Sequence, residues 1–124
     1  MTSIGHNTWV VPEGYLHGPD SHEGAQVLNT GDVDTHLQIT FYLADRDPVG
    51  PYQVVVPARR TRHIRFADLT EPEPVPRDSG YSAVIVSDRP IVVQHSRVDI
   101  QQAASASSPA VGLTESGNKL DHGL

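Results

Sequence analysis

The chain has 124 residues, the size of one domain, and its 37% hydrophobic and 19% charged residues are typical of globular proteins. It contains no cysteine, which excludes a disulfide framework, a thiolate nucleophile and a cysteine-ligated zinc site. The net charge of -6 argues against a generic nucleic-acid binder, because neutralising phosphates needs a basic surface. The first residues lack a secretory signal pattern and no apolar run is long enough to span a membrane, so we expect a soluble cytoplasmic protein.

In chain order, Trp9–Val11 is a candidate first strand and Ala25–Asn29 a second. The Asn-Thr-Gly-Asp sequence at 29–32 is a turn signal. It predicts that the second strand forms a hairpin with the next one, His36–Leu43. In His36–Leu43 apolar and polar residues alternate, so we expect this strand to have one buried face.

The next run, Tyr52–Val56, ends at Pro57, which fits an edge strand or a strand end because proline cannot donate to the ladder. Arg60–Phe66 alternates again, and by parity its first arginines share the face of Ile64. We expect them at the start of the strand, where their stems cover apolar surface beyond the core. Residues 71–76 contain three prolines and are predicted to form an extended loop that crosses between sheets.

The last predicted strands are Ser82–Val86 and Ile91–Arg97, and the Ser-Asp-Arg-Pro sequence at 87–90 predicts a hairpin-like connection between them. Frequent turns without helical periodicity favour an all-β fold, a jelly-roll-like β-sandwich of short antiparallel strands over residues 1–103. From residue 104 the composition changes to alanine, serine and glycine, so we predict a flexible C-terminal tail at 104–124.

Histidines and arginines on or beside the predicted strands are the candidate ligand-binding residues. Six of them could line a polar site for a sugar or an anion: His22, His36, Arg60, His63, His95 and Arg97. His22 and Glu23, with His36 or His63, would also offer ligands that zinc, iron or nickel accept. Their spacing matches no short-range metal signature, so we predict neither a metal nor a cofactor. The alternative is that these histidines form hydrogen bonds on strand faces or at subunit contacts.

Four of the nine basic residues lie within 59–65. Guanidinium groups on a strand suit bidentate contact with phosphate, which makes Arg59, Arg60 and Arg62 candidate DNA-binding residues. The alternative is that these arginines pair with carboxylates of the same protein and hold strands or subunits together. The candidate carboxylates are Glu13, Glu23, Asp32 and Asp68.

Motifs for catalysis are missing from the sequence. It contains no Gly-x-Ser-x-Gly elbow, no glycine-rich phosphate loop and no cysteine. Serine, histidine and aspartate are present, but their presence alone specifies no triad. We therefore predict no catalytic residue and a protein that is not an enzyme.

Three segments of the chain, taken together in their order and spacing, resemble the soluble sensory rhodopsin transducer family. They are Glu13-Gly14-Tyr15 with Ser21-His22-Glu23 and Leu28-Asn29-Thr30-Gly31-Asp32; Pro48-Val49-Gly50-Pro51-Tyr52 with Val56-Pro57-Ala58-Arg59-Arg60-Thr61, His63 and Arg65-Phe66; and Pro90-Ile91-Val92-Val93-Gln94-His95 with Arg97. The resemblance implies a β-sandwich protomer, a homotetramer and a cytoplasmic signalling adaptor for a membrane sensory rhodopsin, with DNA contact as a further option. The family's sandwich is also similar to carbohydrate-binding modules, so a sugar- or anion-binding module unrelated to light sensing is the alternative function.

Overall fold

The computed structural model describes residues 4–18, 21–97, 106–108, 111–113 and 119–120. These residues form nine strands and one short 3-10 helix, and no α-helix occurs among them. The elements are β1 (His6–Leu16), β2 (Gly24–Asn29), β3 (Thr35–Tyr42), β4 (Val49–Val56), β5 (Arg60–Arg65), η1 (Phe66–Asp68), β6 (Ser79–Arg97), β7 (Ala106–Ser108), β8 (Val111–Leu113) and β9 (Lys119–Leu120). All pairings between strands are antiparallel, which confirms the predicted all-β fold.

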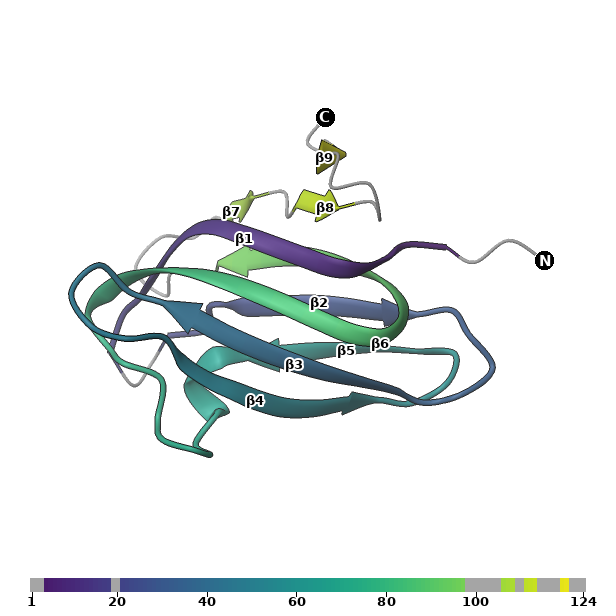
Figure 1. The fold of residues 1–124 in the computed structure, drawn as a ribbon, viewed down its shortest axis with the longest axis horizontal. Helices are drawn as coiled ribbons and strands as arrows, with labels where there is room; N and C mark the ends of the chain where they lie inside the picture. Colours follow the sequence, from purple (N-terminus) through teal and green to yellow (C-terminus); the bar gives the residue numbers. More distant parts are fainter. Residues whose placement is uncertain (1–3, 19–20, 98–105, 109–110, 114–118, 121–124) are drawn as a thin grey trace.

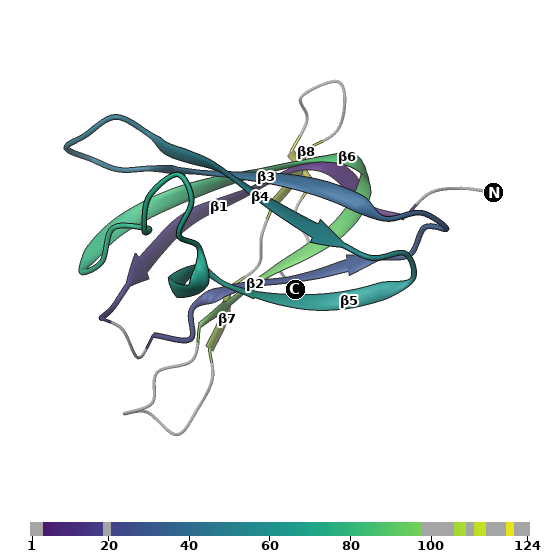
Figure 2. The same ribbon diagram turned by 90° about the horizontal axis from the view of Figure 1, so that it is seen from below.

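The strands form a curled sheet whose two halves face each other (Figure 1). The first half, called the first sheet below, has the order β4-β3-β6-β1-β8-β9. The second sheet contains β5, β2, β6 and β7 in that order. Figure 2 shows the two layers, with β6 passing from one to the other. The fold is therefore a sandwich whose two sheets share one long strand.

Strand β6 is continuous over 19 residues, so the predicted hairpin at 87–90 is wrong. Its first part, up to Ser87, pairs with β1 and β3, and its second part, from Val92, pairs with β2. The register with β1 is irregular where the strand leaves the first sheet. Pro90 lies in this crossover, where a missing N–H group breaks no regular ladder. The turn-like residues therefore mark a change of sheet and not a reversal of the chain.

The predicted hairpin between β2 and β3 is also wrong. Strand β2 pairs with β5 and β6, whereas β3 pairs with β4 and β6, so the chain changes layers after Asn29. The buried Asn29 side chain holds this crossover: its Oδ1 accepts a hydrogen bond from the Gly31 N–H. Its Nδ2 lies 2.9–3.2 Å from the carbonyl oxygens of Val33, Val56 and Pro57. One side chain thus joins the two loops that connect the layers at this end.

The core lies between the layers. Strand β3 follows the predicted alternation, with Leu37, Ile39 and Phe41 fully buried. The Phe41 ring makes edge-to-face contacts with the rings of Tyr52 on β4, Phe66 on η1 and Tyr81 on β6. Such contacts stabilise aromatic pairs beyond their area of burial. These rings therefore pack the first sheet against η1, which follows β5 of the second sheet.

The proline-rich loop 71–76 connects η1, next to the second sheet, with the start of β6 in the first. Its backbone is attached to the core by Tyr52, whose hydroxyl donates to the Glu73 carbonyl at 2.6 Å. Burial, with the negative charge of Glu73 as a smaller cause, raises the pKa of Tyr52 to about 12. The Tyr52 hydroxyl therefore stays protonated, as a donor must.

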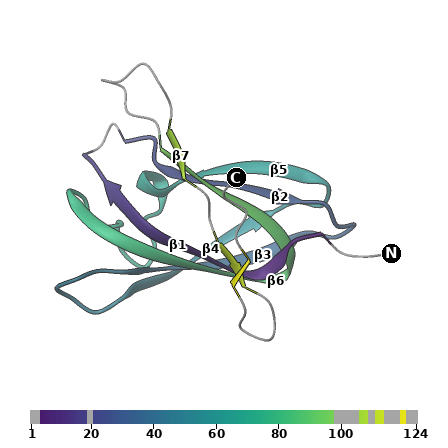
Figure 3. The same ribbon diagram turned by 90° about the horizontal axis from the view of Figure 1, so that it is seen from above.

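The predicted flexible tail, residues 104–124, lies mostly outside the described residues. Within it, β7 pairs with the end of β6, β8 pairs with β1, and β9 pairs with β8 (Figure 3). Strand β7 therefore extends the second sheet next to β6, and β8 and β9 extend the first sheet next to β1.

Candidate functional site

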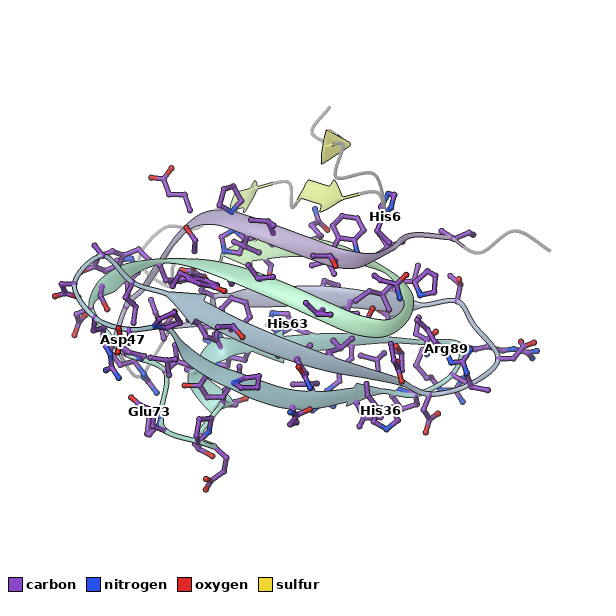
Figure 4. All side chains as sticks on the ribbon, viewed as in Figure 1. His6, His36, Asp47, His63, Glu73 and Arg89 are labelled. Atoms are coloured by element: carbon purple, nitrogen blue, oxygen red, sulfur yellow. The ribbon has the colours of Figure 1, made fainter. Side chains whose placement is uncertain are left out.

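Of the six predicted ligand-binding residues, the five whose side chains the structure describes do not converge on one site. His36 lies on β3 in the first sheet and His63 on β5 in the second, and Figure 4 shows these two side chains on different strands. His95 points into the core, whereas His22 is half-buried and Arg60 is exposed. The backbone of Arg97 ends β6, and its side chain lies outside the described residues.

His95 belongs to a buried polar cluster with Glu23 and Tyr81. The side chains of His95 and Glu23 are each only 1% exposed, and His95 Nε2 lies 3.0 Å from Glu23 Oε1. The same carboxylate oxygen accepts hydrogen bonds from the Tyr81 hydroxyl and, at 3.2 Å, from the Tyr15 backbone N–H. The Tyr81 hydroxyl also lies 3.4 Å from His95 Nε2. Burying a carboxylate is costly unless it is hydrogen-bonded, and this one has several donors.

Part of this cluster could have been found in the sequence. His95 shares strand parity with Ile91 and Val93, which indicates that it points inward. Glu23 and Tyr81 carry no such signal, because Glu23 precedes its strand and Tyr81 reads as an ordinary core aromatic. The cluster forms because Tyr81 and His95, which lie in the two halves of β6, both come within hydrogen-bonding distance of Glu23 in the second layer.

His63 lies on the outer face of the second sheet, away from His95. Its Nε2 is 3.1 Å from Ser96 Oγ on β6. Gly24, the cross-strand partner of Ser96 on the intervening β2, carries no side chain, so His63 can reach across that strand. A Cβ at Gly24 would also lie 2.0 Å from the Ile64 carbonyl oxygen, so this position requires glycine. His63 and His95 therefore lie on opposite faces of the second sheet.

His36 pairs with Asp88 at the crossover of β6. Its ring Nδ1 lies 3.3 Å from one carboxylate oxygen, and its backbone N–H donates to the other at 2.9 Å. The Thr35 hydroxyl donates to that second oxygen at 2.8 Å. The hydrogen bond from the His36 backbone is the largest cause that holds the pKa of Asp88 below its usual value of 3.8. This carboxylate fastens the start of β3 to β6.

The three candidate DNA-binding arginines are exposed, and all contact groups within the chain. The Arg59 guanidinium pairs with Asp32 at 2.8 Å, and Arg60 donates to the Arg59 carbonyl at 3.0 Å. Arg62 donates to the Val55 carbonyl of β4 at 2.6 Å, which links the edge strands of the two sheets. Of the four candidate carboxylate partners, Asp32 is found here and Asp68 pairs with Arg65 at 3.7 Å.

Neither a metal-binding cluster nor a membrane-spanning helix is found in the part of the chain that the structure describes. No group of three or more histidine, aspartate or glutamate side chains lies close enough there to hold a metal ion. No helix in those residues is long and apolar enough to cross a membrane.

The fold and the buried cluster define a small antiparallel β-sandwich, and comparison with known proteins places it in a family. The family model described as "Anabaena sensory rhodopsin transducer" matches residues 4–113. The chain therefore belongs to the Anabaena sensory rhodopsin transducer family, which confirms the resemblance found in the sequence.

Two solved structures are similar to the chain. The structure titled "Anabaena sensory rhodopsin transducer" has 52% sequence identity and a TM-score of 0.70, over 77% of this chain and 99% of that chain. "Crystal Structure of Thermotoga maritima 1070" has 29% identity and a TM-score of 0.75, over 93% of this chain and 99% of that chain. No curated protein matches the chain significantly.

Replacing Tyr81 by phenylalanine tests the buried cluster. The ring and its contacts with Phe41 and Phe66 remain, but Glu23 loses one donor in a buried place. We expect the free energy of unfolding in urea to fall by about 1–3 kcal/mol. Tyr42→Phe, which removes an exposed hydroxyl, is the matched control and should change it by less than about 0.5 kcal/mol. Equal effects of the two variants would contradict the role of the cluster.

The Asp88 contacts predict a pH dependence of stability. The folded state lowers the pKa of Asp88 below 3.8, so its ionised form stabilises the fold above that pH. This contribution is lost as the pH falls below 3.8 through the folded-state pKa. In urea unfolding, wild type should exceed Asp88→Asn in stability at neutral pH, and the difference should shrink in acid. A difference that is the same at both pH values would show that the charge of Asp88 does not stabilise the fold.

Proposed function

We propose that this protein is a non-enzymatic signalling adaptor that binds a membrane sensory rhodopsin from the cytoplasmic side and relays its state. The observation that carries the proposal is membership of the transducer family, together with 52% identity to a structure titled "Anabaena sensory rhodopsin transducer". The coverage of 99% of that chain supports transfer of the role to the whole fold and not to a fragment of it.

The adaptor role fits the positions of the predicted ligand-binding side chains. The histidine and carboxylate most deeply buried, His95 and Glu23, bind each other inside the core, where a substrate would have to displace them. Of the other predicted residues, His36, Arg60 and His63 are exposed on different strands, and such positions suit protein contacts. We propose a homotetramer as the working form, because several copies of each face would then be presented to a receptor.

Binding to a rhodopsin tests the proposal directly. A sensory rhodopsin encoded in the same genome, held in lipid nanodiscs, is titrated with the purified protein in the dark and under illumination. We expect saturable binding whose affinity differs between the two conditions, because a relay must bind the two receptor states differently. An ion-pumping rhodopsin in the same nanodiscs is the control. Absence of binding in both conditions would overturn the adaptor function. The tetramer is tested separately, by measuring the molar mass of the free protein in sedimentation experiments.

Direct contact with DNA is a second proposal, supported by the exposed arginines Arg59, Arg60 and Arg62 at the start of the edge strand β5. Their contacts with Asp32 and with backbone carbonyls would have to be exchanged for phosphates, which weakens the case relative to receptor binding.

The salt dependence of DNA affinity tests this contact. If the arginines bind phosphates, affinity falls steeply with salt, and each replacement by alanine lowers the slope of log affinity against log salt by roughly 1. Arg46→Ala, which removes an exposed arginine paired with Glu73 elsewhere on the molecule, is the matched control. A slope unchanged in the triple variant would contradict the contact.

A further inference from the structure

The end of the sandwich where β1 and β3 finish and β6 begins, towards the left in Figure 1, has an excess of negative charge. Two connecting segments meet there, 43–48 between β3 and β4 and 69–78 between η1 and β6. Figure 4 shows Asp47 and Glu73 at this end and Arg89 at the other. The two segments contain two basic residues, Arg46 and Arg77, but five exposed acidic ones: Asp45, Asp47, Glu71, Glu73 and Asp78.

Both arginines of this end form contacts within the chain. The Arg46 guanidinium pairs with Glu73 at 3.0 Å and so joins the two segments. The Arg77 guanidinium donates to the Ala67 carbonyl at 3.1 Å. The Tyr52 hydroxyl, which donates to the Glu73 carbonyl, attaches the second segment to β4. The acidic residues are therefore carried on two loops that are joined to each other and to the core, so their charge is presented at a defined place.

A hollow of about 550 Å³ lies beside these loops, on the outer face of the first sheet. Its floor is made of small residues of β6, Gly80 and Ser82, which lie opposite Tyr15 of β1 and Tyr42 of β3. The two tyrosines stand on either side of this floor and are 38% and 47% exposed. Ala44, from the first acidic segment, also lines the hollow. The hollow and the acidic loops therefore form one continuous surface.

A β-bulge adds a carboxylate to the hollow. The register between β1 and β6 shifts between Val11 and Gly14, so Pro12 and Glu13 together oppose Ser82, and both are exposed. Regular alternation would have turned Glu13 towards the core. The Ser82 hydroxyl donates to the Pro12 carbonyl at 2.7 Å and holds the bulge in place. Glu13 is the one charged residue among the described residues that line the hollow.

We propose that the hollow and the acidic loops, residues 12–15, 42–48 and 69–82, form an acidic face that docks the basic cytoplasmic loops of the membrane receptor. This inference rests on the adaptor function proposed above and names its contact surface. Cytoplasmic loops of membrane proteins carry an excess of lysine and arginine close to the membrane-spanning segments. The negative charge of the acidic face is complementary to such loops.

The hollow suits a lysine or arginine side chain of such a loop. A cation can pack on the face of an exposed tyrosine ring, while the Glu13 carboxylate accepts its N–H groups. Tyrosine on one side and arginine on the other are also the residues that most often dominate the affinity of protein interfaces. An anionic partner is disfavoured, because the one charged residue lining the hollow is negative.

The proposal also gives the adaptor an orientation. The exposed arginines Arg59, Arg60 and Arg62 lie at the opposite end, where β4 ends and β5 begins, and would repel a basic loop. With the acidic face on the receptor, these arginines point away from the membrane.

The experiment measures association and dissociation rates of the full chain with the sensory rhodopsin in nanodiscs, over a range of salt concentrations. We expect Asp45→Asn/Asp47→Asn to slow association several-fold and to weaken its salt dependence, because exposed charges steer the encounter. Tyr42→Ala should raise the dissociation rate roughly tenfold, since an aromatic anchor is lost. Glu13→Gln should raise the dissociation rate as well, because the cation in the hollow loses its carboxylate partner.

Two matched controls make the same kinds of change at the opposite end. Asp32→Asn/Asp34→Asn removes two exposed charges, and Val33→Ala truncates an apolar side chain that is 44% exposed. Both should bind the rhodopsin at wild-type rates.

Three results would overturn the inference while leaving the adaptor function in place, each with wild type bound to the rhodopsin. The first is unchanged rates in all the acidic-face variants. The second is a loss of affinity in the control variants that equals the loss in the acidic-face variants. The third is a changed molar mass of free Tyr42→Ala in sedimentation, which would make the hollow a contact between copies of the chain. Absence of rhodopsin binding by wild type would overturn the adaptor function and this inference together.

Discussion

The hydrogen-bond ladder of β6 is the constraint on which the other features depend. This 19-residue strand pairs with β1 and β3 in its first part and with β2 and β7 in its second. A continuous strand cannot slip in one sheet without moving in the other, since a shift of one residue would turn its side chains to the wrong face in both. The register on β6 therefore sets which residues meet in the core and which meet on each surface.

The buried cluster shows how this constraint is used. Tyr81 and His95 lie on the two parts of β6, and both reach Glu23, which directly precedes β2. A buried carboxylate with well-placed donors is costly to rearrange, because each misplaced donor leaves an unsatisfied group. The cluster therefore holds the two layers in one relative position, and through the Tyr15 N–H it also holds the bulged end of β1. Core and outer face are coupled at this end of the sandwich.

Charges on the surface act mainly to fasten strand ends and edges. Asp88 ties the start of β3 to the crossover of β6, and Arg62 ties the edge of β5 to β4. Individual exposed ion pairs contribute little to stability, so their value lies in positioning the strand ends. The exposed candidate residues His36, Arg60 and His63 are thereby left on separate strands of the sandwich.

The sequence by itself determined the local structure and the family. The alternation in His36–Leu43 predicted a strand with one buried face, observed as β3, and the order of the family segments predicted the transducer resemblance. What the sequence could not determine was pairing: the turn signals at 29–32 and 87–90 predicted hairpins, but the chain changes sheets at both places. Turn residues encode a local backbone direction, whereas strand partners depend on contacts between residues far apart in the chain. For the same reason only the tertiary structure decided that His95 meets Glu23 and Tyr81, and that His63 lies on the opposite face of the second sheet.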